Sequence, residues 1–212
     1  MQNKILTISG FATKPDSINH HLDLKADYLD YINMKEDEIY QKTINKNYSL
    51  IIGWSLGGHI ALKLAKKHNI KNLILITTAY NFICENNGIN STNYQIFSNN
   101  LLINKNKTLK KFEQFVNFGS KNKAKLINYN YSTSNLIYWL KKLKENAETN
   151  LEQKTNITFI SANNDFLIYK NHVKNFATRF KNAKVIELEK TNHAAFINKK
   201  IFFKKIINDF NI

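Results

Sequence analysis

The chain has 212 residues, enough for one sizeable hydrophobic core plus a small insertion, and its 31 basic and 16 acidic residues give a formal charge of +15. The single cysteine excludes a disulfide framework and a cysteine-based zinc cluster. Lysine supplies almost all of the positive charge, which argues against base-specific nucleic-acid binding because arginine is preferred for that task.

Targeting and cofactor signals are also missing from the sequence. The apolar stretch at residues 5–8 is too short for a signal peptide, and no run is long enough to cross a membrane. Neither a phosphate loop nor a dinucleotide fingerprint occurs. We therefore expect a cytoplasmic, monomeric protein that binds neither membrane nor nucleic acid and needs no cofactor or metal.

The predicted elements alternate between strands and helices, which is typical of an α/β fold with a mostly parallel sheet flanked by helices. Strands are expected near residues 4–9, 27–32, 49–53, 72–77, 156–161 and 184–188. Helices are expected near residues 55–68, 108–118, 135–146, 168–179 and 195–209. Residues 83–150 break the alternation, because they carry helical patterns without a strand. They are expected to be a helical insertion in a core of residues 1–82 and 151–212.

The third predicted strand runs into a glycine-rich turn with one serine at its centre. The sequence is Leu50-Ile51-Ile52-Gly53-Trp54-Ser55-Leu56-Gly57-Gly58, and a helical pattern follows it. A sharp strand–turn–helix connection leaves little room for side chains two residues before and after Ser55, where glycines stand. This layout is typical of a nucleophile elbow, which exposes a serine hydroxyl above the positive end of a helix. The alternative is an ordinary turn with a buried serine.

A nucleophilic serine requires a base and an acid that orients the base. His193 follows an alternating apolar segment at residues 183–188, and Asp165 follows another at residues 156–161. Both loops would emerge at the carboxyl edge of one parallel sheet, in the chain order serine, acid, histidine. The sequence therefore predicts a catalytic triad of Ser55, Asp165 and His193. The alternatives are a surface histidine and an ordinary turn aspartate.

Two backbone N–H groups must also face the oxyanion that forms during ester hydrolysis. One is predicted at Leu56, the residue after the nucleophile. The other is predicted at Phe11, because Gly10 permits a turn directly after the first strand. Alternatively, Gly10 only ends that strand.

Three segments resemble α/β-hydrolases and, among them, the pimeloyl-[acyl-carrier protein] methyl ester esterases of biotin synthesis. They are Gly53-Trp54-Ser55-Leu56-Gly57-Gly58, Phe115-Val116-Asn117-Phe118-Gly119 and Asn192-His193-Ala194-Ala195-Phe196-Ile197. The similarity extends from Ile5 to Phe210. It implies an α/β-hydrolase fold in which residues 83–150 form a small helical cap over the site; the alternative is that these helices only pack against the core. It also implies a serine carboxylesterase that cleaves the methyl ester of a carrier-bound acyl chain. It also implies that the chain starts at the third strand of the full fold, without the leading hairpin.

We expect six residues to contact the substrate. Phe11 and Trp54 are held beside the serine by the oxyanion loop and the elbow, and the other four lie in the cap. The cap residues are Phe115, Phe118, Gly119 and Trp139. Their neighbourhood has apolar residues at helical spacing, which fits either a roof over an acyl chain or a core stripe that attaches the cap.

The resemblance implies an acidic acyl carrier protein as partner. Residues 83–150 hold ten lysines and four glutamates, so the cap could steer an acidic carrier to the site. Alternatively, the lysines reflect a composition that is uniform along the chain. Other functions stay open, namely a broad short-chain carboxylesterase or acyl thioesterase of the same fold, and a binding protein or lyase built on it.

Overall fold

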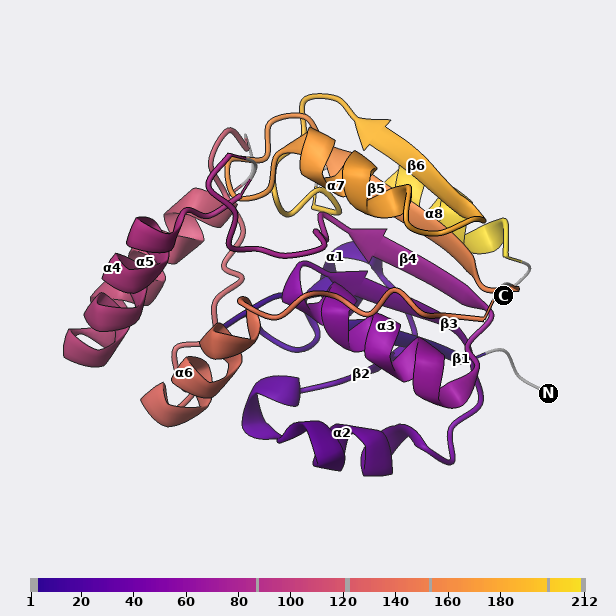
Figure 1. Ribbon diagram of the computed structural model, residues 1–212, viewed down its shortest axis with the longest axis horizontal. Helices are drawn as coiled ribbons and strands as arrows, with labels where there is room; N and C mark the ends of the chain where they lie inside the picture. Colours follow the sequence, from indigo (N-terminus) through magenta and orange to yellow (C-terminus); the bar gives the residue numbers. More distant parts are fainter. Residues whose placement is uncertain (1–3, 87, 121–122, 153, 198, 211–212) are drawn as a thin grey trace.

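Six parallel strands form one sheet in the order β2-β1-β3-β4-β5-β6 (Figure 1). The computed structural model describes residues 4–86, 88–120, 123–152, 154–197 and 199–210, and the sheet lies within them. All neighbouring pairs are parallel, so the predicted α/β architecture is confirmed. The strands are β1 (Lys4–Ile8), β2 (Asp27–Tyr28), β3 (Tyr48–Trp54), β4 (Asn72–Ile76), β5 (Asn156–Ala162) and β6 (Ala183–Leu188).

The central strands are apolar on both faces because helices cover the sheet on both sides. In β3, the side chains of Leu50, Ile52 and Trp54 belong to one buried cluster, whereas that of Ile51 belongs to the other. This alternation follows from the two-residue period of a strand. All four residues are buried, which explains the continuous apolar run that precedes Ser55.

Helices pack their apolar sides against these two clusters. In the described part of the body they are α1 (Ser17–Leu22), α2 (Glu36–Thr43), α3 (Leu56–His68), α7 (Lys170–Ala177), α8 (Lys200–Asn208) and the 3-10 helix η1 (Tyr31–Asn33). α3 and α7 share one cluster through Leu64 and Val173. α1 and α8 share the other cluster through Leu22 and Phe203. The sheet is therefore sandwiched between two helical layers, as expected for an α/β fold.

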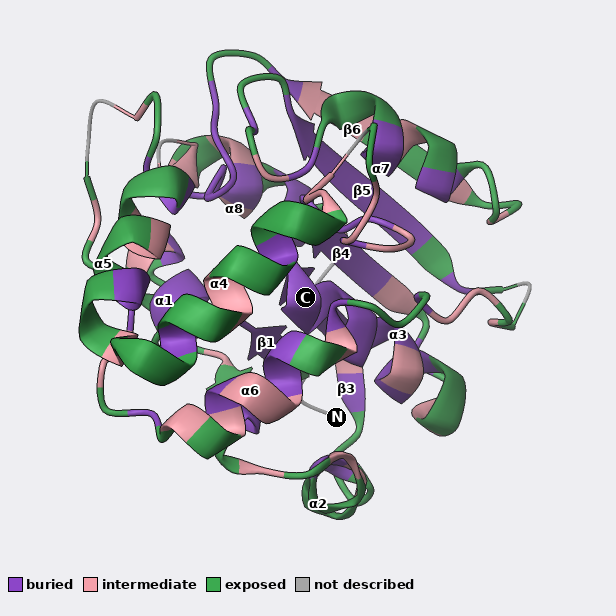
Figure 2. Ribbon diagram, turned by 60° about the vertical axis from the view of Figure 1, so that its left-hand side comes forward, coloured by how far each residue is buried: buried purple, intermediate pink, exposed green. Residues whose placement is uncertain are grey.

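The segment between β4 and β5 forms a separate group of helices. Its described helices are α4 (Ser91–Ile103), α5 (Lys105–Val116) and α6 (Thr133–Lys142). Figure 1 shows them beyond the edge of the sheet toward which the strand arrows point. Figure 2 shows that much of their outer surface is exposed. Each helix begins at a polar side chain that accepts a backbone N–H: Asn90, Asn104 and Ser132 respectively.

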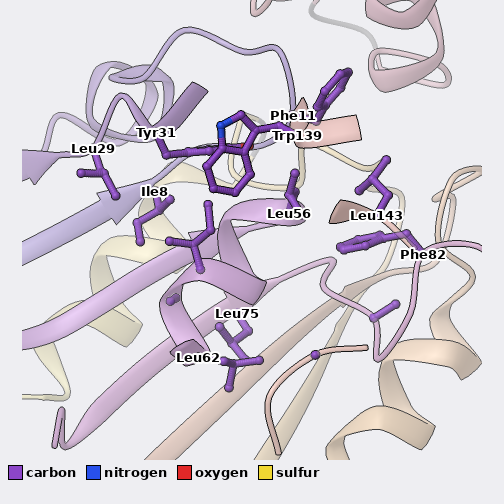
Figure 3. Close-up of a cluster of buried hydrophobic side chains, with 14 of the residues drawn as sticks. Ile8, Phe11, Leu29, Tyr31, Leu56, Leu62, Leu75, Phe82, Trp139 and Leu143 are labelled. Carbon is purple, nitrogen blue, oxygen red and sulfur yellow. The ribbon is translucent and has the colours of Figure 1, made fainter. Parts of the chain in front are cut away.

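Trp139 attaches this helical group to the body. Its ring meets Tyr31 edge to face at a centroid distance of 4.8 Å, and its indole N–H donates to the carbonyl of Met34 at 3.1 Å. Figure 3 shows Trp139 and Tyr31 together with Ile8 and Leu56 in the same buried cluster. The helical group is thus anchored directly above the start of α3.

A ring of four charged side chains, from α2, α3, α6 and the turn after α6, reinforces this attachment. Lys63 pairs with Glu36 at 2.6 Å and with Glu145 at 3.2 Å, and Lys142 pairs with the same two carboxylates at 3.2 and 2.8 Å. Burial alone would lower the pKa of Lys63, but the hydrogen bonds and charges of both carboxylates outweigh it and raise that pKa. The side chains are partly exposed, so we assign each pair no more than about 1 kcal/mol.

Several predicted boundaries differ from the structure. The strand expected at residues 27–32 ends at Tyr28, because the chain turns into η1. The helix expected at residues 195–209 begins only at Lys200. Helices α1, α2 and α4 were not predicted. In α4, serine and asparagine interrupt the apolar pattern, and both residues favour caps and turns over helix interiors.

Candidate active site

Ser55 occupies the turn between β3 and α3, and its backbone conformation is strained. Its φ is +54° and its ψ is −124°, a combination that side-chain-bearing residues rarely adopt. The backbone N–H of Ser55 donates to the carbonyl of Ile76 at 2.9 Å, which ties the turn to the end of β4. The residue is 8% exposed, at the edge of the core. The expected strand–turn–helix connection around Ser55 is therefore present.

The glycines around Ser55 permit close contacts between backbones. A Cβ atom on Gly57 would lie 2.2 Å from the carbonyl oxygen of Ile8, and one on Gly53 would lie 2.7 Å from the carbonyl oxygen of Gly57. Both distances are far below van der Waals contact, and backbone atoms cannot move aside cheaply. The small residues thus let the start of α3 lie directly against the end of β1.

Asp165 and His193 form a buried pair at the carboxyl ends of β5 and β6. The Nδ1 atom of His193 lies 2.7 Å from Oδ2 of Asp165. The other carboxylate oxygen, Oδ1, accepts the backbone N–H groups of Leu167 at 2.8 Å and Ile168 at 3.0 Å. Both partners are almost completely buried. Because a carboxylate only accepts, Nδ1 carries the proton, and a neutral His193 would leave Nε2 free to act as a base.

The main chain of His193 is bonded to the neighbours of Ser55. Its carbonyl accepts the indole N–H of Trp54 at 2.8 Å and the hydroxyl of Thr77 at 3.0 Å. The rings of Trp54 and His193 also lie 5.8 Å apart. In the described residues no hydrogen bond joins the Ser55 hydroxyl to the His193 ring. Such bonds are often long in enzymes without substrate and tighten in the complex.

The loop after β1 lies beside the elbow. Gly10 faces the Trp54 indole so closely that an added Cβ atom would lie 3.3 Å from the ring. Phe11, the next residue, and Leu56, the first residue of α3, are the two predicted oxyanion donors. The N–H of Leu56 belongs to the first turn of its helix, where backbone donors lack intrahelical acceptors. The donor roles of both residues stay predictions.

Backbone strain is concentrated at this edge of the sheet. Within the described ranges, two of the non-glycine residues with positive φ, Asp23 and Asn69, are the C-caps of α1 and α3. The other four are Ala12, Ser55, Thr77 and Lys190, with φ values of 58°, 54°, 44° and 54°. They follow β1, β3, β4 and β6 respectively. Residues held in sparsely populated conformations cluster at functional sites, where the surrounding structure over-determines them. The concentration of strain at the carboxyl edge therefore marks the same region as the Asp165–His193 pair.

The predicted substrate residues fall into two groups. Phe11, Trp54 and Trp139 are buried, and each has defined packing or hydrogen-bond partners. Phe115, on α5, and Phe118, just after that helix, are 58% and 55% exposed. The buried indoles thus have structural contacts of their own, and substrate contact stays a prediction for all of these residues.

Gly119, the remaining predicted substrate residue, follows Phe118 and has a φ of +75°. No heavy atom lies within 4 Å of the position that its Cβ would occupy. The glycine is therefore explained by its left-handed conformation rather than by a close approach, and substrate contact again stays a prediction.

Phe11 links the elbow region to α4 and α5. Its ring meets Phe97 of α4 at 6.3 Å and Phe112 of α5 at 5.9 Å, both nearly perpendicular. Phe97 and Phe112 also contact each other at 5.6 Å. This aromatic triplet fixes the positions of α4 and α5 relative to the loop after β1.

Sequence reasoning missed Phe166 and Thr77. Phe166 directly follows Asp165, is 57% exposed, and meets Phe118 edge to face at 4.7 Å. A large aromatic residue in a polar turn, next to a predicted catalytic acid, is the signal that could have identified it. Thr77 offered no comparable signal, because its role depends on which carbonyl its hydroxyl reaches.

His59 lies one turn beyond Ser55 on α3 but faces away from the site. Its Nε2 lies 2.8 Å from the carbonyl of Ala79, which can only accept, so Nε2 carries the proton. Burial lowers the pKa of His59 from 6.5 to about 4. The Nε2 atom of His59 is therefore occupied by a hydrogen bond to Ala79, which excludes this histidine as the base for Ser55.

The described residues contain no group of three or more His, Cys, Asp or Glu side chains that could hold a metal ion. Among those residues there is also no helix whose length and apolar character would let it span a bilayer.

Comparisons with known proteins establish the fold. No family model matches the chain, and no curated protein matches it by sequence. An esterase from Exiguobacterium antarcticum is similar in structure with a TM-score of 0.82 at 15% identity, over 100% of this chain and 92% of that one. A hydrolase from Oleispira antarctica has a TM-score of 0.78 at 12% identity, over 98% and 92%. A bromoperoxidase from Bacillus anthracis has a TM-score of 0.73 at 12% identity, over 99% and 92%. The chain thus has the α/β-hydrolase fold, as the sequence predicts.

Proposed function

We propose that this protein is a serine hydrolase of carboxylic esters, with Ser55 as nucleophile, His193 as base and Asp165 as the orienting acid. The observation that carries the proposal is the buried Nδ1–Oδ2 contact of 2.7 Å, beside the strained serine turn. This contact holds the histidine in the tautomer that leaves Nε2 available. The α/β-hydrolase fold adds support, because its sites lie at the carboxyl edge of the sheet.

The reaction proceeds by two acyl transfers. The Ser55 hydroxyl attacks the ester carbonyl while His193 takes its proton, and Asp165 stabilises the resulting imidazolium. The backbone N–H groups of Phe11 and Leu56 bind the oxyanion. His193 then protonates the departing alcohol, and a water molecule that it deprotonates releases the acid from Ser55.

The exposed aromatic residues favour an apolar acyl group. Phe118 and Phe166 form a contact pair directly beside Asp165, and Phe115 is exposed on the preceding helix. Exposed apolar side chains at the rim of a site are an interaction surface for ligands. An extended acyl chain could contact these three aromatic side chains, whereas an acetyl group is too short to do so.

For the particular substrate we propose the methyl ester of a pimeloyl chain carried by an acidic acyl carrier protein. The proposal is supported by the resemblance of the segments around Ser55 and His193, and by exposed lysines on the cap. Those exposed lysines are Lys107, Lys110, Lys111, Lys123, Lys125, Lys141 and Lys144. Positive charge at a site mouth accelerates association with an anionic partner. Short-chain esters or acyl thioesters are the alternative substrates of the same site.

The nucleophile is tested by a fluorophosphonate label and by turnover of p-nitrophenyl butyrate. Ser55→Ala should abolish both while the thermal unfolding curve stays cooperative. Ser134→Ala, an exposed serine on α6, is the matched control and should retain both. Label or turnover retained in Ser55→Ala would exclude the proposed nucleophile.

The substrate is tested by comparing methyl pimeloyl-carrier protein with free methyl pimelate at increasing salt. A carrier-dependent enzyme should prefer the carrier form, and kcat/KM for that form alone should fall steeply with ionic strength. Equal kcat/KM values for both forms would favour the broad esterase instead. Rescue of a biotin-requiring strain that lacks its own esterase, by the unchanged protein but not by Ser55→Ala, would support the same pathway role.

A further inference from the structure

We infer that Trp54 and Thr77 are positioning residues that hold the catalytic base through its main-chain carbonyl. This inference rests on the proposed function, because it assigns a task to residues around His193. The Trp54 ring lies beside the His193 ring at a centroid distance of 5.8 Å, but its N–H, like the Thr77 hydroxyl, donates to the main chain. Their common target is the carbonyl oxygen of His193.

The two hydrogen bonds use both lone pairs of one oxygen. The Trp54 indole N–H donates at 2.8 Å and the Thr77 hydroxyl donates at 3.0 Å. All three residues are buried, so solvent does not compete for these bonds. With the Nδ1 atom bound to Asp165, His193 is fixed at both its main chain and its ring. Rotation of the ring away from Ser55 would then require breaking a buried hydrogen bond.

Thr77 adopts a strained conformation in the position from which its hydroxyl reaches His193. Its φ of +44° is rare for any residue with a side chain and rarer for a β-branched one. Its backbone N–H donates to the carbonyl of Ile160 at 2.8 Å, so the strained residue is pinned between β4 and β5. Strain of this kind persists where the surrounding structure imposes it, and it points to function.

Trp54 couples the base to the nucleophile. It precedes Ser55 in the chain, so any displacement of the elbow moves the indole that supports His193. Its ring also meets Phe196 edge to face at a centroid distance of 5.0 Å, which restricts the orientation of the indole. Trp54 therefore fixes the position of the Ser55 hydroxyl relative to the His193 imidazole, although the two residues lie far apart in sequence. Misplacement of a reacting group by about 1 Å can cost on the order of 100-fold in rate.

The closing experiment compares Thr77→Val, which removes the hydroxyl at nearly equal volume, with Thr77→Ser, which keeps it. Thr77→Val should lower kcat about 10- to 100-fold, with KM changed less than about threefold, because substrate binding is untouched. Thr77→Ser should stay within about threefold of the unchanged protein. Trp54→Phe, which removes the indole N–H and part of the ring, should lower kcat to a similar extent; only kcat is compared for this variant, because Trp54 is also a predicted substrate contact.

A readout independent of activity separates the inference from the proposed function. The exchange rate of the His193 Nδ1 proton, followed by NMR, should rise in Thr77→Val and Trp54→Phe but not in Thr77→Ser. If the unchanged protein hydrolyses no ester, the proposed function fails, while this exchange pattern still decides whether the two residues hold His193. Equal exchange in all variants, or equal kcat losses for Thr77→Val and Thr77→Ser, would overturn the inference. If Thr77→Val does not fold, Trp54→Phe decides.

Discussion

Acid should destabilise this protein through one buried histidine, His59. The side chain lies within the core behind the elbow, packs on Phe82 at 4.7 Å and donates to the carbonyl of Ala79 at 2.8 Å. Burial is the main cause of its lowered pKa, and the charge of Lys63 acts in the same direction. In the unfolded chain the same imidazole is solvated and titrates near 6.5.

The size of the effect follows from the pKa difference. Each pK unit corresponds to about 1.4 kcal/mol, so lowering the pKa from 6.5 to about 4 corresponds to about 3 kcal/mol. Below pH 6.5 the unfolded chain binds a proton that folded His59 does not. The free energy of unfolding should therefore fall as the pH drops from 6.5 to about 4, and level off below that for this group.

Urea unfolding at several pH values between 7.5 and 4 measures this dependence. In His59→Gln the amide keeps a donor for the carbonyl of Ala79 but cannot titrate. The free energy of unfolding lost between pH 6.5 and 4 should therefore be about 3 kcal/mol smaller than in the unchanged protein. Carboxylates contribute equally in both proteins and cancel in the comparison. An identical pH dependence of the free energy of unfolding in His59→Gln and the unchanged protein would refute the reasoning.

Three further substitutions test the turn at Ser55, the Asp165–His193 pair and the exposed aromatic residue Phe166. Gly57→Ala places a Cβ atom 2.2 Å from the carbonyl oxygen of Ile8 and should lower the free energy of unfolding by about 3 kcal/mol or prevent folding, as urea titration would reveal. Asp165→Asn should reduce kcat for an ester by roughly 10³- to 10⁴-fold while the circular dichroism spectrum is retained, and a smaller loss would argue against its proposed role. Phe166→Ala should raise KM for octanoyl esters about tenfold over acetyl esters, and an equal change for both would exclude an acyl contact.

The fold was predictable where the apolar period was strong and the ends were marked. β3, the turn at Ser55 and α3 combine a continuous apolar run, flanking glycines and a helical pattern, and the structure agrees closely there. α4 was missed because asparagine and serine dilute its apolar face, although the cap at Asn90 is a start signal. The segment after Tyr28 has the composition of a strand, but tertiary packing of Tyr31 under Trp139 converts it to a 3-10 turn.

The site was predictable only as far as chain order and loop position determine it. Asp165 and His193 each follow a strand, and parallel strands bring such loops to one edge, so their contact could be expected. The target of the Trp54 indole could not, because a donor 139 residues from its acceptor depends on the whole sheet being in register. Burial also depends on the whole fold. The spacing of apolar residues along a helix or strand therefore could not predict that Trp54 is buried and Phe118 exposed.

The hydrogen bond from Trp54 to the carbonyl of His193 joins residues 139 positions apart, so the active site can be assembled only late in synthesis. The nucleophile turn contacts β1, β3, α3 and the end of β4, but its partner loop follows β6. During synthesis, a ribosome-bound chain that has emerged only as far as β5 would hold an assembled elbow without any base beside it. Competence would then arise in a single late step, after the last strand docks, rather than growing gradually with chain length.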